Sequence, residues 1–189
     1  MKTPTQIWYD LNSKEDRDKG REVLKGNLPR LEVPKTRIEK ILNMIGYGVY
    51  ILVIIFLLIK LFQLPDEIPA HFNMSGEVTR WGSKYELLIL AIIGTFTVLI
   101  TEFFEKHPEF HNYPSRINED NAEQFYLNSR RMLNQMKNIM SLMFAFIIIE
   151  MILVSEGEGK GFGMWPMFLL LIALFIPLII GIVRQTKIK

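Results

Sequence analysis

Ionisable side chains inside long apolar runs are the first candidates for chemistry in this sequence. Lys60 and Glu150 each lie four to five residues from one end of such a run. At helical rise both would sit roughly 6–8 Å inside an apolar layer. They predict one of three arrangements: an intramembrane ion pair between two helices, two side chains that reach the polar boundary separately, or a proton or ion relay.

Histidine is the other residue type here that could hold a ligand. His107 and His111 have the i,i+4 spacing that places two rings on one face of a helix. Pro108 interrupts that interval, no third ligand is evident, and His71 lies in a separate polar segment. We therefore expect no metal site and no cofactor.

Motifs of known enzyme classes are missing from the chain. The sequence contains no G-x-S-x-G, no H-E-x-x-H and no phosphate-binding glycine loop. It has no cysteine, which excludes disulfides, thiolate metal sites and cysteine nucleophiles. We expect a protein that is not an enzyme. The charges of the N-terminal tail are evenly mixed, so we also expect no nucleic-acid partner.

Four apolar blocks must position these residues. Each approaches the roughly 20 residues that cross a bilayer core, and they predict an all-α integral membrane protein of four helices. The expected spans are about 41–62, 85–104, 139–154 and 164–183. Together they form a membrane domain, 41–183, between a charged N-terminal tail, 1–40, and a basic C-terminal tail, 184–189.

A polar connector, 105–138, joins the second and third spans. Asn118 is the expected N-cap of its helix, and an apolar stripe follows at spacings of three and four. The stripe comprises Ala122, Phe125, Ser129, Met132, Leu133, Met136 and Met140. Arg130 and Lys137 fall mostly off that face. Because no helix breaker follows, we expect one helix of roughly 35 residues, amphipathic over 118–138 and spanning thereafter.

The distribution of basic residues predicts the orientation. Ten Lys/Arg lie in the N-terminal tail, five in the connector and three in the C-terminal tail, whereas the segments on the other side carry three. This asymmetry follows the positive-inside rule. It predicts cytoplasmic termini, a cytoplasmic connector and an outer loop at 64–84.

The outer loop, LPDEIPAHFNMSGEVTRWGSK, is polar and punctuated by proline and glycine. Loops of this length without structure of their own tend to be functional. Ser83 and Glu86 fit a capping box for the next span. We expect the loop to form a recognition surface made by Pro69, His71, Phe72, Gly76, Trp81, Gly82 and Lys84.

The same loop carries a family resemblance. Its pattern runs Leu64-Pro65, Ile68-Pro69, His71-Phe72, Gly76 and Arg80-Trp81-Gly82-Ser83-Lys84. A second block runs His107-Pro108-Glu109, Asn112-Tyr113-Pro114, Asn121-Ala122-Glu123-Gln124 and Arg130-Arg131-Met132-Leu133. The chain resembles, over roughly residues 40–183, the bacterial family known as domain of unknown function 1648. That family is similar to the N-terminal part of the immunity protein for the sporulation-delaying toxin of bacilli. The resemblance implies a multi-pass protein of the bacterial cytoplasmic membrane.

Three functions remain open at this stage. The outer loop could recognise an extracytoplasmic toxin peptide or envelope ligand. The chain could instead be a small transporter or channel subunit that uses Lys60 and Glu150. A third reading, implied by the resemblance, is a signalling partner whose 118–138 helix or N-terminal tail sequesters a cytosolic regulator. In every case the lipid bilayer is a partner.

Overall fold

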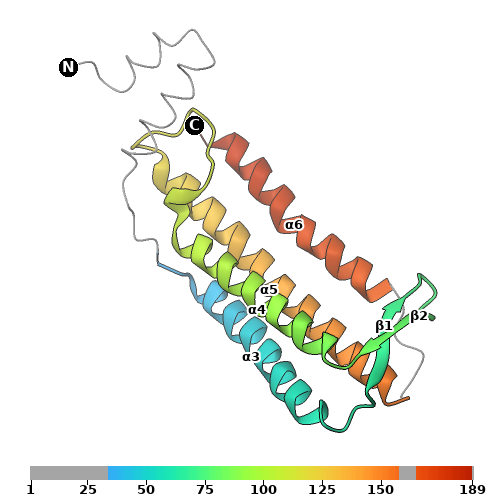
Figure 1. The fold of residues 1–189 in the computed structure, drawn as a ribbon. Coiled ribbons are helices and arrows are strands. Elements are labelled where there is room, and N and C mark those ends of the chain that lie inside the picture. Colours follow the sequence, from blue (N-terminus) through green and yellow to red (C-terminus); the bar gives the residue numbers. More distant parts are fainter. Residues whose placement is uncertain (1–33, 158–164, 189) are drawn as a thin grey trace, which may run out of the picture.

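A computed structural model of the chain describes residues 34–157 and 165–188 of the 189. Four long helices dominate it, with a small β-hairpin between the first two (Figure 1). The helices are α3 (Arg37–Lys60), α4 (Glu86–Lys106), α5 (Ala122–Ser155) and α6 (Trp165–Lys187). The hairpin strands are β1 (Glu67–Phe72) and β2 (Val78–Ser83), and a single 3₁₀ turn, η1 (Pro108–Phe110), follows α4.

Each of the four helices is long and apolar enough to cross a membrane. Their outward surfaces carry many exposed isoleucines, leucines and phenylalanines, which suits contact with lipid rather than water. The expected all-α membrane protein with four spanning helices is therefore confirmed. Most of the 1–40 tail and the first residue of the expected fourth span lie outside the described residues.

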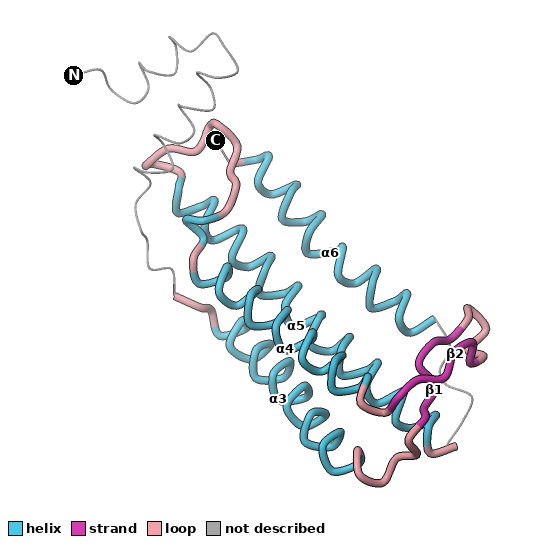
Figure 2. Tube along the Cα trace, in the orientation of Figure 1, coloured by secondary structure: helices cyan, strands magenta, loops and turns pink. Residues whose placement is uncertain are grey.

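Helix α5 is the centre of the bundle. It packs against α3, α4 and α6, and it runs without a break through the bundle (Figure 2). Its 34 residues confirm the expected single long helix. At one end of the bundle, which we call the connector end, α3 and α5 begin and α4 and α6 finish. The opposite end carries the hairpin and is called the hairpin end (Figure 1).

An apolar core fills the hairpin half of the bundle. Its fully buried members come from α3, α4, α5 and the hairpin: Leu57, Leu87, Ile148, Ile152 and Ile68. The Tyr50 hydroxyl donates a hydrogen bond to the Ala91 carbonyl at 2.8 Å and so joins α3 to α4. The core therefore ties the hairpin to three helices.

One predicted helix start is wrong, and the other lies three residues before the bounds of α5. Ser83 ends β2, and α4 begins after Tyr85, while the Glu86 carboxylate is engaged by Arg80. The expected capping box at Ser83 and Glu86 therefore does not form. By its bounds α5 begins after Asn121, but Asn118 makes the hydrogen bonds of an N-cap. Its Oδ1 accepts from the Asp120 and Asn121 amides at 3.0 and 3.1 Å, and its carbonyl accepts from the Ala122 amide at 2.9 Å.

A capping box does form at the start of α3. The Glu39 amide donates to Thr36 Oγ1 at 3.3 Å, and the Thr36 amide donates to Glu39 Oε2 at 2.6 Å. This reciprocal pair satisfies two amides that the first helical turn leaves without partners. It also fixes where the chain enters the bundle.

The expected outer loop is largely a β-hairpin. Strands β1 and β2 pair antiparallel, with a register irregularity between Pro69 and Phe72. Asn73 Oδ1 accepts from the Ser75 and Glu77 amides, and Gly76 has a φ of 83°, so the chain reverses at residues 73–77. Sequence reasoning missed the strands because proline and a bulge interrupt the alternation that marks a half-buried strand.

Candidate functional site

The hairpin separates the predicted recognition residues into buried and exposed groups. Pro69 is buried and Phe72 packs against the apolar core. His71 is exposed, and Trp81 exposes 59% of its surface. Pro69 pairs across the hairpin with Trp81, and His71 pairs with Arg80. The structure therefore brings His71 and Trp81 onto neighbouring positions of two strands, where both remain accessible.

Three of the predicted residues shape the hairpin. Gly76 adopts the positive φ of the turn. Lys84 donates to the Leu64 carbonyl at 3.2 Å and lies 3.1 Å from the Asp66 carboxylate. It therefore closes the base of the hairpin. A side chain at Gly82 would lie 3.0 Å from Ala70 Cβ and collide with the Glu86 carboxylate.

That Glu86 carboxylate fastens the hairpin to α4. Arg80 Nη1 and Nη2 donate to its two oxygens at 3.1 and 2.8 Å. These hydrogen bonds raise the pKa of the Arg80 guanidinium. Bidentate pairs of this kind add geometric specificity to their electrostatic attraction. The position of the exposed Trp81 next to Arg80 is thereby set relative to α4.

Lys60 forms its ion pair at the last turn of α5. Its ammonium donates to Glu156 Oε1 at 2.6 Å, so α3 and α5 are joined at the hairpin end. Glu156 follows Glu150 by six residues. An ion pair between these two helices was one of the three predicted arrangements, and the carboxylate that Lys60 contacts here is that of Glu156. Pairing of Lys60 with Glu150 stays a prediction.

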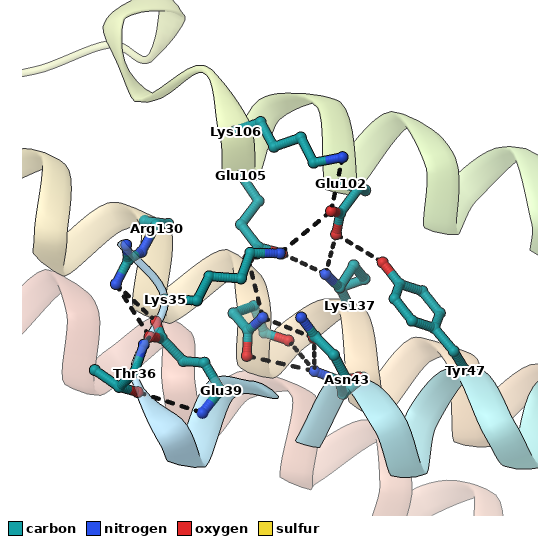
Figure 3. Close-up of polar contacts among 12 residues, drawn as sticks. Lys35, Thr36, Glu39, Asn43, Tyr47, Glu102, Glu105, Lys106, Arg130 and Lys137 are labelled. Carbon is teal, nitrogen blue, oxygen red and sulfur yellow. Dashed lines mark hydrogen bonds and ion pairs between the residues drawn. The ribbon is translucent and has the colours of Figure 1, made fainter. Parts of the chain in front are cut away.

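A second candidate site lies at the connector half of the bundle, where polar side chains from α3, α4 and α5 meet (Figure 3). We call it the polar cluster. It comprises Lys35, Glu39, Asn43, Tyr47, Glu102, Glu105, Arg130, Asn134, Lys137 and Asn138. Three cations and three carboxylates balance within it.

Lys137 is the central cation of the polar cluster. Its ammonium contacts the carboxylates of Glu102 and Glu105, both on α4. Lys35 adds a second ammonium, 2.8 Å from Glu105 Oε1 and 3.2 Å from Glu102 Oε1. The Tyr47 hydroxyl donates to Glu102 Oε2 at 2.6 Å. Because charges in an apolar surrounding are costly unless paired, this arrangement holds the three helices in one register.

Amides and a second ion pair extend the polar cluster along α3 and α5. Asn43 Oδ1 accepts from the amides of Asn134 and Asn138, at 2.8 and 2.9 Å. One turn away, Arg130 Nη2 donates to both oxygens of Glu39, at 3.1 and 3.0 Å. Both members of that ion pair are nearly inaccessible to solvent.

The polar cluster corrects the predicted face of α5. The expected apolar stripe contained Met132 and Met136, with Arg130 and Lys137 away from the buried side. In the structure Arg130, Asn134, Lys137, Asn138 and Ser141 are buried against α3 and α4. The sequence did contain a signal for this buried face, because these polar residues recur at spacings of three and four and therefore lie on one side of a helix. Glu102 and Glu105 were missed because they lie at the end of an apolar run.

The two neighbouring histidines have separate partners. His107 Nδ1 lies 3.1 Å from Glu109 Oε1, whereas His111 Nε2 lies 2.9 Å from the Phe104 carbonyl oxygen. Burial lowers the pKa of the His111 imidazole. Within residues 34–157 and 165–188, no group of three or more His, Asp or Glu side chains is placed to hold a metal ion.

Comparison with known proteins bears on the hairpin. Residues 48–95 match the family model described as a domain of unknown function, DUF1648. The match covers about a quarter of the chain. The DUF1648 segment comprises much of α3, the whole hairpin and the first half of α4. It contains every predicted recognition residue and none of the polar cluster.

A relative outside the bacteria was also found. The chain is similar to an uncharacterized protein of Archaeoglobus fulgidus, with 30% identity over 104 residues. The matched part covers 50% of this chain and 52% of that protein, so the chain spans about half the length of its curated relative. No solved structure matches. The bacterial source and the link to toxin immunity stay predictions.

Proposed function

We propose that this chain is a non-enzymatic membrane protein whose hairpin, residues 64–84, recognises an extracytoplasmic ligand. Toxin-peptide immunity and recognition of an envelope component are the two forms that this function could take. The observation that carries the proposal is the two-sided hairpin. Ile68 anchors it in the apolar core, while His71 and Trp81 stay exposed. An ordered, anchored surface binds without first losing conformational entropy.

The asymmetry in the distribution of basic residues supports an extracytoplasmic position for the hairpin. Lysine and arginine are concentrated in the two tails and in the 105–138 connector. By the positive-inside rule these segments are cytoplasmic, which leaves the hairpin outside a bacterial cytoplasmic membrane. The bundle geometry agrees with this arrangement, because the connector and the hairpin lie at opposite ends (Figure 1).

The charge of the hairpin end supports a cationic ligand. Residues 60–86 and 148–157 together carry six Asp/Glu and three Lys/Arg. Each of these three cations already pairs with a carboxylate, namely Glu156, Glu86 and Asp66. Glu67 and Glu77 are exposed beside them. A cationic, amphipathic peptide fits this surface, because its charges complement the acidic surplus and its apolar side chains can contact the Trp81 ring.

The test combines protection of cells with binding in vitro. A deletion strain is challenged with a panel of cationic membrane-active peptides and envelope antibiotics, and is complemented with wild type, His71→Ala or Trp81→Ala. Binding of the peptides is measured on purified protein in nanodiscs. We expect selective sensitivity in the deletion strain, rescue by wild type, and loss of both rescue and binding in the two variants.

Met74→Ala is the matched control, because Met74 is exposed at the hairpin turn and is not among the predicted recognition residues. It should rescue as wild type does. Full rescue by His71→Ala and Trp81→Ala, at equal protein levels, would exclude recognition through the hairpin. No selective sensitivity in the deletion strain would remove immunity and leave the alternatives below.

Transport is the alternative that one specific observation favours. Charged side chains buried between membrane helices are typical of proton and ion pathways, and the polar cluster supplies Glu102, Glu105 and Lys137. The test is proton flux into vesicles that enclose a pH-sensitive dye, with wild type and Glu102→Gln. Wild-type flux equal to that of empty vesicles would exclude transport through the polar cluster. The same result would exclude transport that uses Lys60 and Glu150, the two residues predicted from the sequence.

Sequestration of a cytosolic regulator has less support. The amphipathic segment of α5 has Ala122 and Phe125 fully buried inside the protein, so these residues offer no docking surface. Most of the N-terminal tail lies outside the described residues. A pull-down from cytosol with the full chain in nanodiscs tests what remains, and recovery of nothing specific would count against it.

A further inference from the structure

Three rings pack together where α4 ends. The Phe103 and His107 centroids are 4.7 Å apart, those of His107 and Phe110 are 5.5 Å apart, and those of Phe103 and Phe110 are 6.1 Å apart. Phe103 and Phe110 are about half exposed. We call these three residues the ring ladder. The rings pack on one another while leaving much of their surface open, so they present a preformed aromatic surface.

The ring ladder continues the lipid-facing stripe of α4. Ile92, Phe96, Leu99 and Phe103 follow one another at spacings of four, three and four, and all four are exposed. These spacings place them on one face of the helix. Beyond Phe103 the stripe passes through His107 to Phe110 in η1. The apolar surface of α4 therefore finishes in rings that carry a polar edge at His107.

Exposed cations surround this end of the bundle. Lys106 closes α4 and bridges back to Glu102 at 3.1 Å, and Arg131 directly follows the buried Arg130. We call the exposed cations of this end the basic collar. All four helices contribute a member, and the set is Arg37, Lys40, Lys106, Arg131, Arg184 and Lys187. The exposed acids of this end, Glu119, Asp120 and Glu123, belong to the connector and the first turn of α5.

We propose that the ring ladder and the basic collar together form a surface that binds the headgroup layer of an anionic phospholipid bilayer. The Phe103 and Phe110 rings suit hydrocarbon and the His107 ring has a polar edge that suits water, so the ladder fits the boundary where the exposed apolar stripe of α4 stops. Cations at that level meet the phosphates, and they attract anionic headgroups more strongly than zwitterionic ones.

This surface sets the depth of the polar cluster. Glu102 precedes Phe103 in α4, and Glu105 precedes Lys106. If the ring ladder lies in the headgroup layer, Glu102 lies at its hydrocarbon side and Glu105 lies level with the rings, on the buried side of α4. The bundle keeps water from the Glu105 carboxylate, and the ammonium groups of Lys35 and Lys137 neutralise both carboxylates.

The depth of the ring ladder is measured by fluorescence quenching with brominated lipids. The protein carries Trp8→Phe, Trp81→Phe and Trp165→Phe, and then either Phe110→Trp or, as hydrocarbon control, Phe96→Trp. Vesicles contain phosphatidylcholine brominated near the headgroup or near the bilayer centre. For Phe110→Trp we expect the shallow bromines to quench more strongly than the deep ones, with a smaller preference or the reverse order for Phe96→Trp. Phe110→Trp fluorescence that neither lipid quenches would overturn the proposal.

The lipid charge is tested separately. The thermal unfolding midpoint is compared in nanodiscs of phosphatidylcholine alone and of phosphatidylcholine with phosphatidylglycerol. Wild type should unfold at a higher temperature in the anionic discs. The triple variant Lys40→Gln, Arg131→Gln, Arg184→Gln should lose about half of that difference, because three of the six collar cations are removed.

Arg80→Gln at the hairpin end is the control, and it should keep the full difference. A wild-type midpoint that does not depend on phosphatidylglycerol would overturn the anionic preference. A triple variant that retains the full wild-type difference would overturn the assignment to the basic collar. The midpoint of the triple variant in phosphatidylcholine alone shows whether it folds, and this readout is independent of hairpin recognition.

Discussion

The Lys137 ammonium and the Glu105 carboxylate contact each other with neither side chain accessible to solvent. Lys137 lies on α5 and Glu105 lies on α4, so the contact fixes two spanning helices relative to each other. Glu102 and Lys35 complete the balance of charge around it. A buried charge without its partner is strongly destabilising, so the polar cluster should behave as one unit.

Removing the central cation should be costly. Lys137→Met leaves Glu102 and Glu105 with one fewer ammonium in an apolar surrounding, and we expect a loss of about 3–5 kcal/mol in the free energy of unfolding. Lys35→Met should cost less, because the Lys35 side chain is 24% exposed and water can replace it. Thermal or denaturant unfolding in detergent measures both. Equal losses for the two variants would show that burial does not set the cost.

Two nearby glycines of α3 offer a matched comparison. A side chain at Gly46 would collide with Asn138 on α5, whereas nothing lies within 4 Å of a side chain added at Gly48. Gly46→Val should therefore cost about 1–3 kcal/mol through overpacking. Gly48→Val should unfold much as wild type does. The unfolding midpoints of the two variants decide the matter, and a destabilised Gly48→Val with an unaffected Gly46→Val would contradict this helix packing.

The hairpin should depend on one buried side chain. Ile68 of β1 is fully buried in the apolar core, so Ile68→Ala should cost about 2–5 kcal/mol. Local opening of the hairpin should also increase its cleavage by protease. Thr79→Ala on the exposed surface of β2 is the control and should change neither quantity. Unaltered proteolysis of Ile68→Ala would mean that the hairpin is held mainly by Lys84 and Arg80.

His111 should make stability depend on pH. Burial lowers the pKa of its imidazole, against the opposing effects of the Phe104 carbonyl and the Glu109 carboxylate. The unfolded chain therefore binds the proton at a higher pH than the folded chain does. Stability is complete above the ordinary histidine pKa of about 6.5 and is lost as the pH falls through that value toward the lower folded pKa.

The unfolding midpoint between about pH 5 and pH 8 checks this linkage. Wild type and His107→Gln should lose stability on acidification, whereas His111→Gln should lose less. His107 is the matched control because its ring is partly exposed and belongs to the same connector. Identical pH profiles for wild type and His111→Gln would assign the effect to other groups.

The sequence alone determined the class of this protein. Runs of about 20 apolar residues are long enough to cross a bilayer core and are unfavourable in water. Inside a bilayer the backbone N–H and C=O groups must hydrogen-bond to one another, which a helix achieves within one segment. Four spanning helices therefore follow from the hydropathy of the sequence. The long α5 was equally readable, since no proline or glycine interrupts residues 122–155. The DUF1648 match covers residues that lie together in the chain, 48–95, whereas the second block of the resemblance, 107–133, lies outside the matched segment.

Only the tertiary structure decided which polar residues face inward. Lys137 and Arg130 read as solvent-facing residues of an amphipathic helix, because a lone lysine or arginine favours water. Their burial depends on Glu39, Glu102 and Glu105, which come from two other helices. The spacing of the polar residues on α5 marks a shared helical face, but the carboxylates that make its burial favourable come from distant segments of the chain. The hairpin was hidden for a related reason: its strands are specified by pairing between β1 and β2, and by Ile68 packing into a core that α3, α4 and α5 supply.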